Sequence, residues 1–104
     1  MSERRSHQWL LVIEPEAQEV FDTLLSGYKQ GIFHTLEQLL LTDDPYLLPF
    51  ITKIKDETFE GLRKFRIGDY RIYIRAVPGE VTHEKPTYKG RLRLVAIVNR
   101  RDAY

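Results

Sequence analysis

The strongest indication of the fold comes from residues 61–73, Gly-Leu-Arg-Lys-Phe-Arg-Ile-Gly-Asp-Tyr-Arg-Ile-Tyr. Phe65 and Ile67 alternate here with Lys64 and Arg66, which is the two-residue period of a β-strand with one apolar and one basic face. The Gly-Asp pair that follows favours a tight turn. The stretch therefore predicts a β-hairpin that buries one face and leaves the other exposed.

The alternation continues beyond the turn, from Tyr70 to Val77. Its apolar face carries Tyr70, Ile72, Ile74 and Ala76, and its opposite face carries Arg71, Tyr73 and Arg75. Pro78-Gly79 is expected to end this strand, with a long polar loop running through Lys89-Gly90. Residues 91–98 are apolar enough to form the central strand of the group.

The N-terminal half has a different pattern. Residues 8–13 are short, apolar and partly β-branched, which predicts a first strand. Pro15 is suited to the first turn of a helix. Apolar residues then recur at the spacing of one helical face, at Ala17, Val20, Phe21, Leu24, Leu25 and Tyr28.

Gly27 and Gly31 are expected to bracket the end of this first helix. A second helix is indicated by Phe33, Leu36, Leu39 and Leu40, and it is expected to stop near residues 42–45. Trp9 and the helix phenylalanines are expected in the core. Residues 45–60 contain two prolines, so we expect an irregular or short helical segment there.

These elements predict an α+β fold: an N-terminal strand, a two-helix hairpin, then a three-stranded antiparallel meander. The 104 residues suit a single domain, 1–104. No apolar run is long enough to span a bilayer and the N-terminus does not resemble a secretory signal, so we expect a cytoplasmic protein without membrane contact. There is no cysteine, and the three histidines lack ligand spacing, so we expect neither a metal site nor a cofactor.

Charge is divided unevenly along the chain although the net charge is only +1. Residues 1–60 carry five basic residues and eleven acidic ones, a net of −6, whereas residues 61–104 carry eleven basic and four acidic, a net of +7. Such asymmetry favours one surface that meets phosphates. Surface charge can also fluctuate along a sequence without a functional reason, and this alternative stays open.

With both helices on one side of the sheet, the other side would carry Lys64, Arg66, Arg71, Tyr73 and Arg75, with Arg100 and Tyr104 nearby. Cations bind phosphates and aromatic rings stack on bases, so this mixture suits RNA. The alternative is that these charges only protect an exposed sheet from aggregation.

Two segments resemble the RelE/ParE toxin superfamily. The first is residues 61–73, and the second is the ending Leu-Val-Ala-Ile-Val-Asn-Arg-Arg-Asp-Ala-Tyr at 94–104. The expected element order is also similar to that family's fold over nearly the whole chain. The resemblance implies the toxin of a type II toxin–antitoxin system, with a cognate antitoxin protein as partner.

RelE-like members of this family cleave mRNA in the ribosomal A site, without a metal, and leave a 2′,3′-cyclic phosphate. By motif, the resemblance implies the catalytic residues Lys64, Arg66, Arg71, Arg100 and Tyr104. Lys64 would be a candidate proton acceptor, Arg71 would hold the scissile phosphate, and Arg100 would stabilise the transition state. RNA-binding residues would be Arg63, Tyr73, Arg75 and Arg101. The alternatives are a ParE-like DNA gyrase inhibitor and a catalytically inactive relative.

Overall fold

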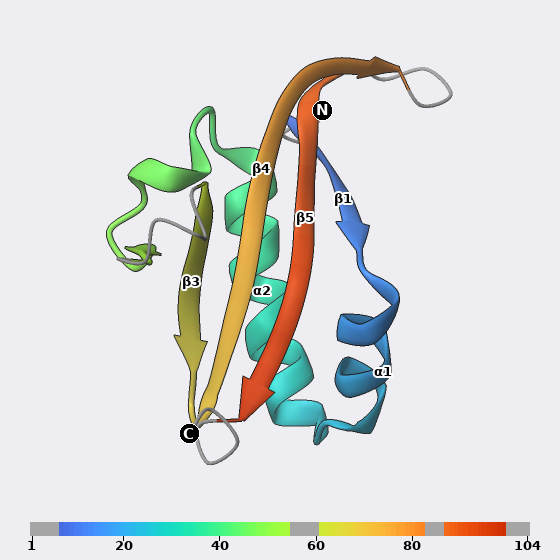
Figure 1. Ribbon diagram of the computed structural model, residues 1–104, viewed down its shortest axis with the longest axis vertical. Helices are drawn as coiled ribbons and strands as arrows, with labels where there is room; N and C mark the ends of the chain where they lie inside the picture. Colours follow the sequence, from blue (N-terminus) through green and yellow to red (C-terminus); the bar gives the residue numbers. More distant parts are fainter. Residues whose placement is uncertain (1–6, 55–60, 83–86, 100–104) are drawn as a thin grey trace, which may run out of the picture.

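The computed structural model describes residues 7–54, 61–82 and 87–99. Figure 1 shows a long, curved sheet with the helices beside and behind it. The elements, in chain order, are β1 (Trp9–Ile13), α1 (Pro15–Thr23), α2 (Ser26–Leu41), a 3₁₀ turn (Pro45–Leu47), β2 (Thr52–Lys53), β3 (Leu62–Ile67), β4 (Tyr70–Thr82) and β5 (Thr87–Asn99).

The five strands form one mixed sheet in the order β1-β5-β4-β3-β2. β1 pairs with β5 in parallel, and the other neighbours pair antiparallel. The predicted α+β class is confirmed, and β5 lies in the interior of the sheet, as its apolar sequence predicts. The 3₁₀ turn agrees with the expected short helical segment, while the two-residue β2 is an addition to the predicted meander.

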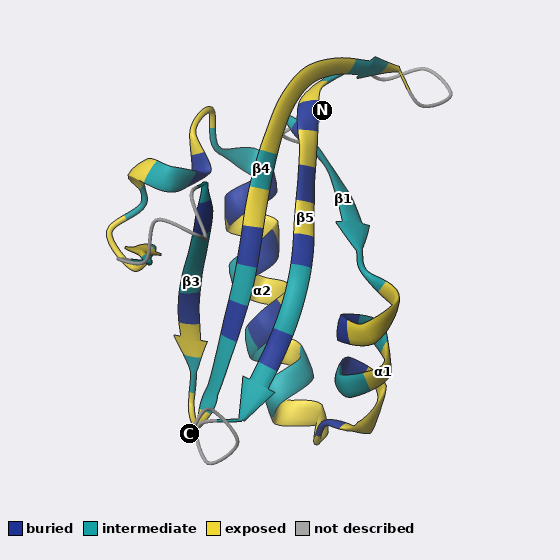
Figure 2. Cartoon of the chain, in the orientation of Figure 1, coloured by how far each residue is buried: buried dark blue, intermediate teal, exposed yellow. Residues whose placement is uncertain are grey.

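Both helices pack on the same face of the sheet, which we call the core face. Four strand residues that point there are fully buried, and they form one cluster with α1 and α2: Ile72, Ile74, Leu92 and Leu94 from β4 and β5, with Ala17, Phe21, Ile32, Leu36 and Leu39 from the helices. Figure 2 shows the resulting alternation of buried and more exposed positions along β4 and β5. The apolar period read from the sequence therefore identifies the core face correctly.

The first helix ends earlier than expected. α1 stops at Thr23, whose hydroxyl donates to the Val20 carbonyl at 2.7 Å, and Leu24 is already extended. Tyr28 and both glycines belong to α2, so the prediction that Gly27 and Gly31 bracket the first helix is wrong. Gly31 serves packing instead, because a Cβ there would lie 3.0 Å from Ile67 Cγ2.

Phe33 is the second correction, because it is 50% exposed rather than part of the core. The buried face of α2 is formed by Ile32, Leu36 and Leu39, and a residue next to Ile32 is rotated about 100° away from it on a helix. Phe33 instead meets Phe21 edge to face, with ring centroids 4.9 Å apart.

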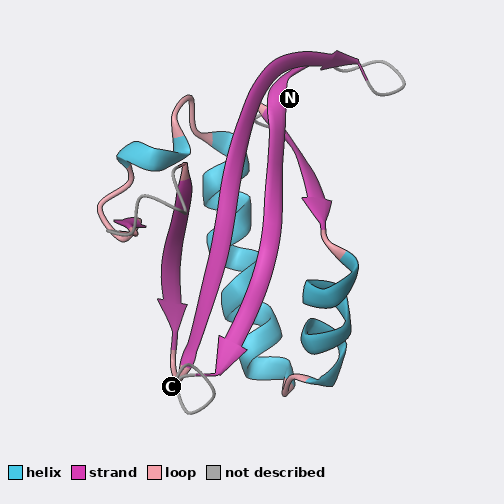
Figure 3. Ribbon diagram, in the orientation of Figure 1, coloured by secondary structure: helices cyan, strands magenta, loops and turns pink. Residues whose placement is uncertain are grey.

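The polar loop expected at residues 78–90 is largely a two-stranded arm. Val81 pairs with Tyr88 and Thr82 with Thr87 beyond an irregularity that follows Pro78, so β4 and β5 are thirteen residues long each. β-branched and aromatic residues favour strand pairing even in a polar segment, and the irregularity accommodates the proline. Figure 3 shows the arm arching away from the rest of the sheet.

The base of this arm is fixed to the end of α2. Trp9 Nε1 donates to the Thr42 carbonyl at 3.1 Å, and Lys89 forms an ion pair with Asp43. Gly90 packs so tightly that a Cβ would lie 2.3 Å from the Val77 carbonyl oxygen and 2.8 Å from the Trp9 ring. These contacts hold β5 in register between β1 and β4.

Candidate nucleic-acid interface

The face of the sheet opposite the helices, here called the outer face, carries most of the basic side chains of the described strands. On β3 and β4, Lys64 lies opposite Tyr73 and Arg66 lies opposite Arg71. We call these four residues the turn-end cluster, because the β3–β4 turn adjoins them. Lys64, Arg71 and Tyr73 are half-buried, whereas Arg66 is exposed.

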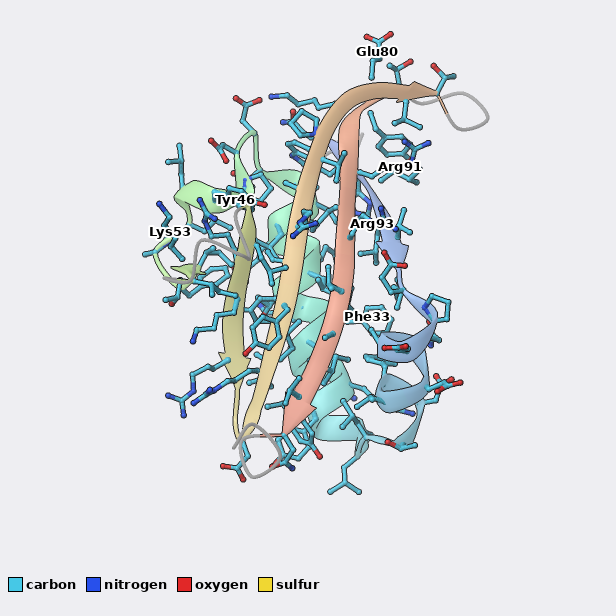
Figure 4. The ribbon with its side chains drawn as sticks, in the orientation of Figure 1. Phe33, Tyr46, Lys53, Glu80, Arg91 and Arg93 are labelled. Atoms are coloured by element: carbon cyan, nitrogen blue, oxygen red, sulfur yellow. The ribbon has the colours of Figure 1, made fainter. Side chains whose placement is uncertain are left out.

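Further along the same face, Arg75 of β4 lies opposite Arg93 of β5, and Arg91 lies opposite Val77. We call Arg75, Arg91 and Arg93 the hairpin-end cluster. Figure 4 shows Arg91 and Arg93 side by side along β5, toward β1. Arg93 forms an ion pair with Glu14, which follows the end of β1.

A bulge in β5 changes which of its residues lie on the outer face beside the turn-end cluster. The β4–β5 register shifts between Tyr73 and Ile74, so that Tyr73 faces Ala96 while Ile74 faces Leu94. The extra residue reverses the alternation of β5, which lets Leu94 and Ile97 both reach the core although they are three residues apart. Ala96 therefore lies beside Tyr73, and Val98 lies beside Arg71.

Two pairs of arginines lie directly opposite each other on this face. Arg66 faces Arg71, and Arg75 faces Arg93, and like charges directly opposite each other on a sheet are destabilising. Within the part of the chain that the structure describes, no carboxylate pairs with Arg66, Arg75 or Arg91. An anion bound between two opposed guanidinium groups would remove the repulsion and gain charge-assisted hydrogen bonds.

Arg91 and Arg93 are not among the binding residues expected from sequence, although the sequence contains the signal for them. In residues 91–94, arginine alternates with leucine, so burial of Leu92 and Leu94 requires both arginines to face outward. The alternation is easy to miss because most residues of the strand are apolar and because the bulge reverses the alternation further along β5.

Arg63 lies apart from the other expected binding residues. Its register places it on the core face of β3, opposite Ile74, and its guanidinium stacks on the Tyr46 ring at 4.3 Å from the ring centroid. Tyr46 is itself fixed, because its hydroxyl accepts from the Ala76 backbone N–H at 2.9 Å and donates to the Gly61 carbonyl. Arg63 thus packs against the 3₁₀ turn.

The structure therefore brings together five of the expected site residues, Lys64, Arg66, Arg71, Tyr73 and Arg75. Arg100, Arg101 and Tyr104 lie outside the described residues. No three histidine or carboxylate side chains gather as metal ligands within residues 7–54, 61–82 and 87–99. No helix in the same ranges is long and apolar enough to cross a membrane.

Comparison with known proteins supports the fold. No protein-family model matches the chain, and a search of curated proteins finds no match. Among solved structures, the chain is similar to one chain of the RelB–RelE antitoxin–toxin complex from Methanococcus jannaschii, with a TM-score of 0.61 and 16% sequence identity. The match covers 86% of this chain and 91% of that chain, so the likeness extends over nearly the whole domain.

Proposed function

We propose that this chain is the toxin of a type II toxin–antitoxin system and that it cleaves mRNA in the ribosomal A site. The observation that carries the proposal is the turn-end cluster, in which two opposed arginines, a lysine and a tyrosine share one face of the sheet. The fold shared with a chain of an antitoxin–toxin complex and the resemblance in residues 61–73 support it.

The reaction proposed is a transesterification within the RNA strand. The ribose 2′-oxygen attacks the adjacent phosphorus, the bond from phosphorus to the 5′-oxygen breaks, and a 2′,3′-cyclic phosphate remains. The 2′-hydroxyl gives up one proton and the leaving 5′-oxygen takes one, so the step needs no oxidant and no external nucleophile.

Each member of the cluster has a proposed part in this step. Negative charge builds on the phosphoryl oxygens in the transition state, and Arg66 and Arg71 stabilise it from opposite strands. Lys64 accepts the 2′-hydroxyl proton, and Tyr73 across from it stacks on a base, which fixes the strand beside the reacting phosphate. Arg100 and Tyr104 are also proposed to take part in the cleavage step, on the basis of the sequence resemblance alone.

A cognate antitoxin is the proposed partner. It would neutralise the toxin by covering the outer face, for which an extended or helical acidic segment is suited, because acidic side chains can pair with opposed arginines. The gyrase-inhibitor alternative uses the same fold without RNA cleavage, and the experiment below separates the two.

The test is primer extension on a reporter mRNA in a reconstituted translation reaction. Wild type should cut at in-frame positions only when ribosomes are present, and Arg71→Ala should lower the cleavage rate by about 10²-fold or more, the usual cost of removing one transition-state donor. The control is Lys53→Ala, which removes an exposed charge of β2 that lies off the outer face, and it should cut as wild type does.

Two results would contradict the nuclease proposal. One is the absence of cuts from wild-type protein whose melting curve shows that it is folded. The other is equal cleavage by wild type and Arg71→Ala. Inhibition of DNA supercoiling by gyrase, in protein that leaves mRNA intact, would establish the alternative.

A further inference from the structure

We propose that the hairpin-end cluster of Arg75, Arg91 and Arg93 is a second phosphate subsite for a single RNA strand, and that Glu14 competes with RNA for Arg93. This inference deepens the proposed function and rests on RNA being the ligand of the outer face. It concerns three arginines and one glutamate that take no part in the proposed cleavage step.

The position of the cluster is the first support. Arg71 and Arg75 lie on the same face of β4, four residues apart, which at the rise of a strand is about 13 Å. This separation leaves room for two phosphates of one strand, one near each arginine. A strand of several nucleotides can place one phosphate at each cluster, with bases near Tyr73 between them.

The charges within the cluster are the second support. Arg75 directly opposes Arg93, and Arg91 stands two residues before Arg93 on the same face. Three guanidinium groups in so small an area can surround a phosphate and donate to several of its oxygens. A surface that served only solubility would mix charges of both signs, and here a single carboxylate, Glu14, pairs with the cluster in the described chain.

Glu14 gives the subsite a built-in competitor. Its ion pair draws Arg93 toward the end of β1, and so eases the repulsion between Arg93 and Arg75 when no ligand is bound. Its side chain makes no hydrogen bond to the N-terminus of α1, so the carboxylate is not needed as a helix cap. Binding of a phosphate would exchange one partner of Arg93 for another of the same charge.

The test compares the binding of two labelled RNAs at low salt, a dinucleotide with one phosphate and a hexanucleotide that spans both clusters. Wild type should bind the hexanucleotide at least about tenfold more tightly, because a charge-assisted hydrogen bond exceeds one factor of ten in affinity. Arg91→Gln/Arg93→Gln should abolish this advantage, and the slope of log affinity against log salt should become shallower by about 0.7 for each phosphate that the variant no longer neutralises.

Two further variants sharpen the test. Glu14→Gln should tighten hexanucleotide binding, because it releases Arg93 from its ion pair. Lys53→Gln, with an exposed charge removed away from the outer face, should behave as wild type with both RNAs. Melting curves of all variants verify that they are folded.

The inference is overturned if wild type binds both RNAs equally, or if Arg91→Gln/Arg93→Gln keeps the full advantage of the longer strand. It is also overturned if this variant binds an acidic peptide more weakly than wild type does but binds RNA with the same affinity as wild type. The cleavage assay tests the proposed function separately. Length-dependent binding without any cleavage would support the second subsite and contradict the nuclease proposal. Cleavage without length-dependent binding would support the nuclease proposal and contradict the second subsite.

Discussion

The two faces of this sheet are made from alternate residues of the same strands, yet they meet opposite requirements. On β4, Ile72 and Ile74 point to the helices and are completely buried, while Arg71, Tyr73 and Arg75 point away from them. The core face is a continuous apolar cluster in which every side chain gains from burial. The outer face places arginine opposite arginine twice, and like charges directly opposite each other on a sheet repel.

A small domain can thus use alternate residues of one strand for folding and for binding. Apolar burial on the core face supplies stability, so the other face can carry opposed arginines that a bound anion would stabilise further. Substitutions on the core face should therefore lower stability more than substitutions on the outer face do.

The largest effect is expected from Ile74→Ala. Its side chain is fully buried in the core, and truncation of such a residue typically lowers the free energy of unfolding by about 2–5 kcal/mol. Val77→Ala removes methyl groups from the outer face of the same strand, where the residue is 38% exposed, and should cost less than about 1 kcal/mol. Urea unfolding of both variants measures the contrast, and equal losses of stability would contradict it.

Gly90→Ala should destabilise the protein by roughly 3 kcal/mol, the upper end of the usual cost of overpacking. The new Cβ would meet the Val77 carbonyl oxygen, a backbone atom that cannot move aside without disturbing the ladder. Gly27→Ala is the matched control: it adds a methyl group to α2 where no other atom lies within 4 Å, and should be neutral or slightly stabilising. Thermal unfolding distinguishes them, and a Gly90→Ala variant as stable as wild type would show that the arm is less tightly packed.

A smaller decrease, about 1–2 kcal/mol, is expected from Tyr46→Phe, because the Ala76 N–H and the Gly61 carbonyl are both left without their partner. The ring, and with it the stacking of Arg63, is kept. Hydrogen exchange should show faster exchange of the Ala76 amide in the variant. Unchanged exchange would mean that this hydroxyl does not close the end of the β3–β4 ladder.

The smallest effect has the opposite sign. Arg75→Gln removes one member of an opposed pair and should raise the free energy of unfolding by about 0.2–1 kcal/mol while it weakens RNA binding. The effect should shrink in high salt, since repulsion between exposed charges is screened. A variant that is less stable than wild type at low salt would show that this arginine contributes to the fold rather than to a ligand.

The fold is predictable from sequence where one physical rule acts alone. The two-residue period of 64–77 defines both faces of the hairpin, because side chains of a strand must alternate. The predicted end of the first helix is wrong because glycine, although often a stop signal, lies inside α2 here. Gly31 is required for the approach of Ile67, a long-range contact that local sequence does not reveal.

The candidate site is predictable in part for the same reason. Lys64, Arg66, Arg71, Tyr73 and Arg75 follow from alternation, and the structure places them on one face.

Two side chains show the limit of this rule. The expectation that Arg63 binds RNA comes with the resemblance in residues 61–73, but its place in the alternation of β3 puts it on the core face, where it stacks on Tyr46. Glu14 cannot be associated with Arg93 from sequence, since their ion pair depends on the parallel pairing of β1 and β5.

The most direct test of RNA binding by the outer face is an NMR titration that follows the arginine side-chain Nε–Hε signals while a single-stranded RNA hexanucleotide is added. The signals of the outer-face arginines should shift together, namely those of Arg66, Arg71, Arg75, Arg91 and Arg93. The signal of Arg63 should not move, because this side chain is stacked on Tyr46 on the other face. Shifts of Arg63 as large as those of the outer-face arginines, or no shift of the outer-face arginines at all, would contradict the claim that this face of the sheet binds RNA.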